Sequence, residues 1–219
     1  MVTLKTILYT YCVLFLLLVS CSSHPKTHPV TKKQPRHAKF LNKFKSISFD
    51  TLQVHSPDWN RNDKYYGIPL DSVDVTLFPL SMAKEHSIAY PTLFACYKFP
   101  LEGNKYGLIV RAPAMYSSTS IKLFIFDLNV GKLKESVELA DLWIDAGDTI
   151  EKISWLFKEQ EKIKAFTWIR ESHDNDVESL ADTTVDRWDY YYLLSISSGT
   201  DTLSKDSLNL TTQFKHLFP

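Results

Sequence analysis

The stretch IKLFIFDL (Ile121–Leu128), followed by the turn NVG (Asn129–Gly131) and the polar run KLKESVEL (Lys132–Leu139), decides the fold class of this chain. Short runs rich in β-branched and aromatic residues that end at a Gly-containing turn are typical of β-hairpins. The run YYLLSI, ending at Ile196 shortly before Gly199, repeats the pattern. We therefore predict antiparallel strands joined by tight turns.

The same alternation of period two recurs on both sides of this stretch. It divides the chain into two successive sets of four runs, which form a weak repeat over residues 92–141 and 149–212. Each set resembles the four-stranded meander of a β-propeller blade, although two blades cannot close a propeller. We expect an all-β, mainly antiparallel fold of two four-stranded meanders with a sandwich-like or propeller-blade-like body. The eight runs are Leu93–Phe99, Lys105–Arg111, Ile121–Leu128, Lys132–Leu139, Ile150–Phe157, Lys162–Glu171, Trp188–Ile196 and Thr202–Leu210.

The segment before the first meander has weaker patterns. Residues 47–54 and 73–77 alternate as strands do, and we expect the region from Phe49 to Phe78 to cover an edge of the sheet. Helices should be minor, because no long stretch has a period of 3.6. The best candidates are Leu80–His86 and Ser136–Trp143.

The charges of the chain are balanced overall but unevenly distributed. The 219 residues include 25 basic and 25 acidic side chains, and the hydrophobic fraction of 44% is that of a globular protein. A zero net charge argues against a nucleic-acid partner, since such domains are usually strongly basic. All of the acids lie from Asp50 onward, so that residues 46–219, which we expect to form a single β-rich domain, carry about −8.

The N-terminus has the pattern of a secretory signal. The apolar run from Ile7 to Val19 is shorter than the ~20 residues that cross a bilayer, but it suits the core of a signal peptide. It ends in Leu18-Val19-Ser20-Cys21, which resembles the bacterial lipobox. The resemblance implies a signal peptide over residues 1–20 and a lipid on Cys21; the alternative is an ordinary signal with a chance cysteine.

That resemblance also implies a location. Ser22, not Asp, follows the cysteine, and by the sorting rule of enteric bacteria this implies the outer membrane of a Gram-negative cell. After processing, Cys96 is the only free thiol, so no internal disulfide can form, and its apolar neighbours predict a buried, inert side chain.

Residues 21–45 read as a disordered basic tether between the lipid and the body. The tether has three prolines and few large apolar side chains, which cannot form a core. Its charge suits anionic headgroups, although a merely soluble spacer has the same composition. The seven basic residues are Lys26, Lys32, Lys33, Arg36, Lys39, Lys43 and Lys45.

A short motif recurs more often than the composition predicts. Asp followed by Ser or Thr and then by Ala, Ile, Leu, Met, Thr or Val occurs six times, which is similar to the O-glycosylation acceptor motif of exported proteins in the Bacteroidota. The body also resembles uncharacterised lipoproteins of that phylum. The alternative is structural, since Asp ends turns and a β-branched or apolar residue begins strands. The hydroxyl residues are Thr51, Ser72, Thr149, Thr183, Thr202 and Ser207.

No motif assigns a chemistry. Ser81-Met82-Ala83-Lys84 lacks the companion motifs of penicillin-interacting enzymes, and the chain has no phosphate loop, zinc motif or nucleophile elbow. We therefore expect no catalytic residue, no metal and no cofactor. The tryptophans at 143, 155, 168 and 188 either fill a core or stack on a sugar or peptide.

The sequence favours a non-catalytic, lipid-anchored binding or scaffold protein of the cell envelope, whose partners are the membrane and an envelope protein or glycan. The first alternative is an envelope hydrolase that acts on glycans through an unidentified pair of carboxylates. The second is an accessory subunit that joins an outer-membrane complex through an exposed strand edge.

Overall fold

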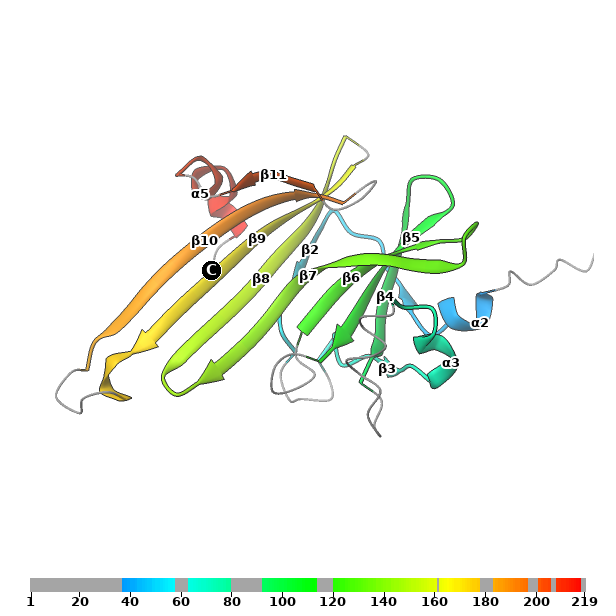
Figure 1. The fold of residues 1–219 in the computed structure, drawn as a ribbon. Helices are drawn as coiled ribbons and strands as arrows, with labels where there is room; N and C mark the ends of the chain where they lie inside the picture. Colours follow the sequence, from blue (N-terminus) through cyan, green and yellow to red (C-terminus); the bar gives the residue numbers. More distant parts are fainter. Residues whose placement is uncertain are drawn as a thin grey trace, which may run out of the picture. The chain divides into compact units, whose positions relative to one another are not determined.

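The computed structural model describes residues 37–57, 63–79, 92–113, 120–160, 162–177, 183–196, 201–205 and 208–217. Strands dominate this part of the chain, which confirms the predicted all-β class, and they form an eleven-stranded mixed sheet (Figure 1). The order along the sheet is β1-β4-β5-β6-β7-β8-β9-β10-β11, while β2 pairs with β8 and β3 pairs with β4. All pairings are antiparallel except that of β1 with β4.

The two predicted meanders are confirmed. The first consists of β4 (Phe94–Leu101), β5 (Lys105–Ala112), β6 (Ser120–Asp127) and β7 (Lys132–Asp145). The second consists of β8 (Asp148–Glu159), β9 (Lys162–Asp174), β10 (Val185–Ser195) and β11 (Asp201–Lys205). The long strand β7 belongs to both, because residues up to Ala140 pair with β6 and residues from Asp141 pair with β8.

The two meanders share a core between their inner faces, as in a sandwich. Side chains from β4, β5 and β6 form one hydrophobic cluster with side chains from β8, β9 and β10. Phe99 also closes over Gly107, its cross-strand neighbour, where an added Cβ would lie 2.4 Å from the ring. The fully buried members of this core include Ile109, Ile121, Leu139, Leu156 and Ile196.

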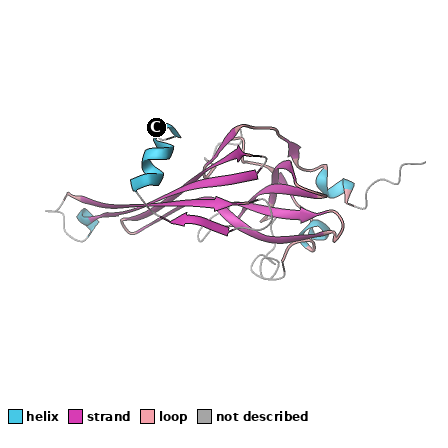
Figure 2. Ribbon diagram, turned by 90° about the horizontal axis from the view of Figure 1, so that it is seen from above, coloured by secondary structure: helices cyan, strands magenta, loops and turns pink. Residues whose placement is uncertain are grey.

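Each meander is also covered on part of its outer face. The outer face of β5 and β6 packs against α2 (Ala38–Leu41) and the region of α3 (Ser72–Val75). The outer face of β8 and β9 packs against α5 (Leu208–Phe214), which lies to one side of the strands in Figure 2. Burial on both faces explains why the run from Leu123 to Phe126 is apolar without interruption.

The segment before β4 pairs with both meanders. The two-residue strands β1 (Lys45–Ser46) and β3 (Ile68–Pro69) lie along β4, and β2 (Thr51–Val54) pairs with β8. The expected strand over 47–54 is therefore shorter than predicted. It lies beside the half of β8 that β7 leaves unpaired, so the region covers an edge as expected.

Two local predictions were wrong. The alternating residues 73–77 were expected to be a strand, but α3 begins there because Asp71 caps it. Its side chain accepts hydrogen bonds from the N–H groups of Val73 and Asp74, and the Asp74 carboxylate accepts one from the N–H of Asp71. The expected helix over 136–143 lies instead within β7, where Leu139 and Ala140 are buried in the core.

The remaining helix candidate, Leu80–His86, lies outside the described residues. The last predicted run, 202–210, divides into β11 and the start of α5. A short 3-10 turn over Lys215–Leu217 follows α5, and another over Asn175–Val177 follows β9. Within the described ranges, no helix has the length and apolar character that a membrane span requires.

The tether was expected to extend to residue 45, but it ends earlier. From His37 onward the chain belongs to the folded body, since Phe40, Leu41 and Phe44 are buried. These apolar residues form a core contact with Phe78 and Phe126, which outweighs the basic character of the segment. The body from residue 37 therefore has 20 basic and 25 acidic side chains and a net charge of −5 instead of −8.

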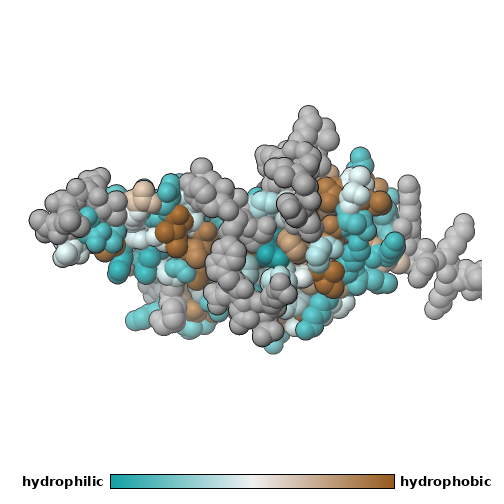
Figure 3. Space-filling model, turned by 90° about the horizontal axis from the view of Figure 1, so that it is seen from below, coloured by the Kyte–Doolittle hydropathy of each residue, from teal (hydrophilic) through white to brown (hydrophobic). Residues whose placement is uncertain are grey.

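Exposed hydrophobic side chains are scattered over the surface. On the face that Figure 3 shows, they form separate patches among hydrophilic residues. Ile144 (64% exposed) and Leu142 lie on one face of the outer part of the second meander, and Trp188 (49%) and Tyr190 (36%) lie on the other. This end of the sheet is therefore less covered than the rest.

Replacing Phe40 by alanine tests whether residues 37–45 belong to the fold. We expect Phe40→Ala to lower the free energy of unfolding by about 3–5 kcal/mol, because the ring is buried against Phe44, Phe78 and Phe126. The adjacent exposed residue provides the control, and Lys39→Ala should change stability by less than about 0.5 kcal/mol. Urea unfolding followed by circular dichroism measures both, and equal stabilities would show that this segment is a tether.

Candidate functional site

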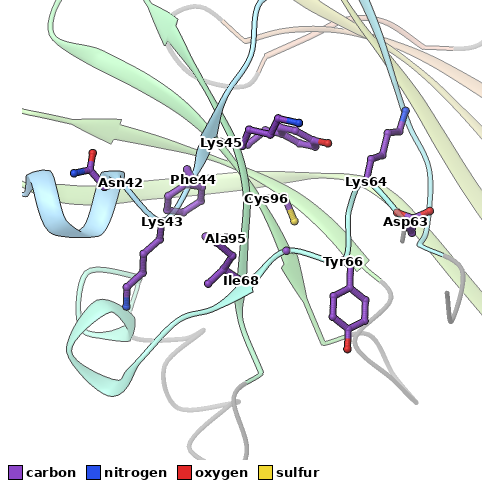
Figure 4. Close-up of a pocket in the computed structure, with 12 residues that line it drawn as sticks. Asn42, Lys43, Phe44, Lys45, Asp63, Lys64, Tyr66, Ile68, Ala95 and Cys96 are labelled. Carbon is purple, nitrogen blue, oxygen red and sulfur yellow. The ribbon is translucent and has the colours of Figure 1, made fainter. Parts of the chain in front are cut away.

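A pocket of about 530 Å³ opens where the edge of β4 is only partly paired. Strand β3 pairs with Phe94 and Ala95 of β4, and β1 pairs with Tyr97 and Lys98. Between them the register of β4 with β5 shifts around Cys96, so a bulge lies at the gap. The pocket has a size usual for small-molecule sites. Its lining residues are Asn42, Lys43, Phe44, Lys45, Asp63, Lys64, Tyr66, Gly67, Ile68, Ala95, Cys96 and Tyr97 (Figure 4).

The wall opposite β4 depends on a glycine. Gly67 has a φ of +71°, and a Cβ at this position would lie 2.9 Å from the carbonyl oxygen of Ala95 and 3.0 Å from Sγ of Cys96. Only glycine combines this backbone conformation with so close an approach. The chain can therefore turn into β3 directly beside the bulge.

A half-buried arginine supports the same wall from behind. The guanidinium of Arg111 lies 3.7 Å from the ring centroid of Phe94 and 4.8 Å from that of Tyr66. Its Nε donates a hydrogen bond of 2.9 Å to the carbonyl oxygen of Tyr66. Arg111 therefore holds Tyr66 in place at the pocket. Arg170, the other strand arginine, pairs with Asp189 at 2.9 Å.

The three lysines of the pocket differ in their partners. Lys43 is bonded to the carboxylates of Asp71 and Asp74, which raises its pKa and lowers that of Asp71 to about 2. In Figure 4 it points away from Lys45 and Lys64. Within the described part of the chain, neither of these two lysines has a carboxylate within 4 Å.

Lys64 lies against other groups of the protein instead. Its Nζ donates a hydrogen bond to the carbonyl oxygen of Gln53 and lies 5.0 Å from the ring centroid of Tyr65. Partial burial of the ammonium lowers the pKa of Lys64. The Asp63 charge offsets part of this lowering, and an anion bound beside the ammonium would offset more of it.

The single carboxylate among the lining residues is already engaged. Asp63 Oδ1 accepts a hydrogen bond from the N–H of Tyr65, and its Oδ2 lies 3.4 Å from Nε2 of His55. Tyr65 is fully buried, and its hydroxyl donates to the carbonyl oxygen of Gln53 at 2.6 Å. Burial raises the pKa of the Tyr65 phenol, which therefore acts as a neutral donor.

The thiol of Cys96 forms the floor of the pocket, and the prediction that it is buried is confirmed. Only 5% of the residue is exposed, and Sγ donates to the carbonyl oxygen of Tyr65 at 3.3 Å. Burial raises the pKa of the thiol to about 12. Because the thiolate is the nucleophile, the side chain is unsuited to covalent catalysis at neutral pH.

A second polar cluster lies at the junction of the two meanders. The Glu138 carboxylate accepts hydrogen bonds from Lys152 Nζ (2.6 Å) and Ser120 Oγ (2.9 Å), and Lys122 Nζ lies 3.9 Å away. The pKa of Glu138 is lowered: the two lysines and the Ser120 hydroxyl outweigh its burial. The pKa of Asp141 is raised by burial and by the neighbouring Glu138 charge. Glu138 and Asp141 are neighbouring carboxylates that could not be singled out as a pair from the sequence.

The expected modification sites are spread over the body and do not form one site. Cys21 and Ser207 lie outside the described residues. Thr149 is half-buried at the start of β8; the exposed hydroxyl residues are Thr51, Ser72, Thr183 and Thr202.

The structural interpretation of the six Asp motifs has support. Asp50 and Asp201 lie at the start of β2 and β11, Asp71 caps α3, and Asp148 begins β8 after a turn. Local geometry therefore explains four of the six aspartates. The hydroxyl residues that follow Asp50, Asp71 and Asp201 are exposed, as an attached glycan also requires.

No family model, curated protein or solved structure matches this chain. The described residues also contain no group of three or more His, Cys, Asp or Glu side chains that could hold a metal ion. Interpretation of the site therefore rests on its own geometry. The pocket lysines were not found from the sequence, where the only signal was Lys64-Tyr65-Tyr66-Gly67, two aromatic residues before a glycine.

The raised pKa of Cys96 predicts a loss of stability at high pH. The unfolded thiol ionises near pH 9 but the folded thiol only near 12, so the free energy of unfolding should fall as the pH rises between these values. The same fall should be smaller in Cys96→Ser. Unfolding in urea from pH 8 to 11 measures this, and equal slopes for the two proteins would contradict the assignment.

Proposed function

We propose that this protein is a non-catalytic binding protein of the cell envelope, anchored by lipid at Cys21, and that its body binds a small anionic ligand in the pocket beside β4. One observation carries the binding function. The pocket presents Lys45 and Lys64 without carboxylate partners, while its own carboxylate, Asp63, is engaged by Tyr65 and His55. The pocket therefore has positive charge to offer a ligand.

The lining also indicates the kind of ligand. An anionic group, a carboxylate or a phosphate, suits the ammonium groups of Lys45 and Lys64. The remaining surface comes from Tyr66, Ile68 and Ala95, which suit a ring or a short apolar segment. A compact acid with one apolar side matches both parts of the lining.

The anchor and the location are proposals from the N-terminal residues. Lipidation of Cys21 with two or three acyl chains would hold the protein durably at a membrane. Ser22 favours the outer membrane of a Gram-negative cell. The basic residues before His37, namely Lys26, Lys32, Lys33 and Arg36, suit anionic headgroups. The exposed Thr51, Ser72, Thr183 and Thr202, together with Thr149 and Ser207, are the proposed glycan acceptors.

Two alternative functions have a weaker basis. Glu138 and Asp141 have pKa values displaced in opposite directions, as a hydrolase requires, but the Glu138 oxygens are held by Lys152 and Ser120. An accessory subunit needs an exposed edge, and β11 is the last strand of the described sheet.

Titration with anions tests the pocket. Calorimetry of the full-length protein in detergent with citrate, glucuronate and inorganic phosphate should detect binding of at least one that weakens as salt is added. Lys64→Ala should weaken this binding about tenfold, because one of two cationic contacts is lost. The control is Lys134→Ala, an exposed lysine on β7. No binding, or equal binding by both variants, would refute the pocket.

Labelling with radioactive palmitate in a Gram-negative host tests the anchor. The wild type should incorporate label and sediment with the outer membrane, and Cys21→Ala should do neither. Because Cys96 is buried, Cys96→Ser should be labelled like the wild type and serves as the cysteine control. Equal labelling of the wild type and Cys21→Ala would refute the proposal that lipid is attached at Cys21.

A further inference from the structure

The inner face of the second meander continues beyond the facing sheet. In Figure 1, β8, β9 and β10 run past the ends of β4 and β5. On β10, Leu194 lies in the shared core, directly opposite Ala165 of β9, which is opposite Leu156 of β8. Because side chains alternate along a strand, Tyr192, Tyr190 and Trp188 lie on the same face as Leu194.

These three residues form an aromatic ladder, which is the name used below for Trp188, Tyr190 and Tyr192. Exposure rises with distance from the core: Tyr192 is half-buried, Tyr190 is 36% exposed and Trp188 is 49% exposed. Residues two apart in a strand are about 6.8 Å apart, so the ladder extends over roughly 14 Å along β10. The tryptophans of β8 and β9 differ, since Trp155 and Trp168 are buried on the opposite face against α5, whereas Trp143 of β7 lies on the face of the ladder.

Polar groups accompany the ladder. Glu171 lies directly opposite Trp188 in the register of β9 with β10, and Tyr190 donates its hydroxyl to Glu171 Oε2 at 3.4 Å. Asp186 continues the face beyond Trp188, opposite His173. At the inner end, Lys205 Nζ lies 5.8 Å from the ring centroid of Tyr192. Ile169 lies directly opposite Tyr190, so the face combines ring faces with both hydrogen-bonding and aliphatic side chains.

We propose that the aromatic ladder, with Glu171, binds a neutral oligosaccharide of several pyranose units. The ring faces carry negative charge density that attracts the C–H groups on the apolar side of a sugar ring. The Glu171 carboxylate accepts hydrogen bonds from sugar hydroxyls beside the rings. A row of rings along a strand suits an extended, β-1,4-linked chain.

The charges of the face exclude an anionic ligand here. Glu171 and Asp186 flank the exposed end, and the body as a whole carries −5, so an acidic polymer would be repelled. This site is distinct from the pocket beside β4, which offers lysines, and either can fail without the other.

The test uses hexasaccharides and the full-length protein in detergent. We expect calorimetry or tryptophan fluorescence to detect binding of cellohexaose or chitohexaose at concentrations up to about 5 mM. Trp188→Ala should weaken binding about tenfold, equivalent to 1.4 kcal/mol, and Trp188→Phe should weaken it less because a ring remains. Since Trp188 is half exposed, circular dichroism should show both variants folded.

Two control variants separate the sites. Ile144→Ala removes a more exposed side chain from the opposite face of the same sheet end and should leave sugar binding unchanged. Lys64→Ala should also leave it unchanged, while Trp188→Ala should leave anion binding unchanged. The proposal is overturned if neither hexasaccharide binds, or if Trp188→Ala binds as well as Ile144→Ala.

Discussion

The arrangement of this protein depends on one strand that pairs on two sides. Over its first residues β7 bonds with β6, and from Asp141 onward it bonds with β8. A strand shared in this way joins the two meanders in one hydrogen-bonded sheet while their inner faces pack together. Leu139 and Ala140, just before the exchange of partners, are fully buried in the common core. The polar cluster of Glu138 and Lys152 lies at the same junction.

The incomplete pairing that follows explains where the candidate sites lie. Beyond the stretch of β8 that β7 reaches, β2 takes the vacant edge. The edge of β4 is covered only by β1 and β3, each two residues long, and the gap between them is the pocket. At the outer end of the second meander, β8, β9 and β10 extend beyond the first meander, so the aromatic ladder is exposed. Both sites are therefore places where regular pairing or packing ends.

The sequence predicted the regular part of the fold and missed the irregular part for a physical reason. Strand runs such as 121–128 were recognisable because alternation and turns are local properties. Val73 and Val75 alternate as in a strand, but they lie in the helix α3 because Asp71 caps it. The capping residue was visible in the sequence, but the prediction gave more weight to the alternation. The pocket was not predictable, because its walls come from segments around residues 44, 67 and 96 that only long-range pairing brings together. The shared face of Trp188, Tyr190 and Tyr192 was readable, but not that the facing sheet stops short of it.

The distribution of charge links the pocket to the rest of the body. Most ion pairs of the body use its lysines and arginines to neutralise particular acids, as Lys43 does with Asp71 and Arg170 with Asp189. Acids remain in excess, so the surrounding surface is negative overall. Lys45 and Lys64 are among the described lysines that form no ion pair, and the carboxylate of Asp63, also in the pocket lining, is bonded to Tyr65. A positive pocket in a negative surface selects by position: it attracts a compact anion that fits inside, while an extended polyanion meets the repulsion of the surrounding acids.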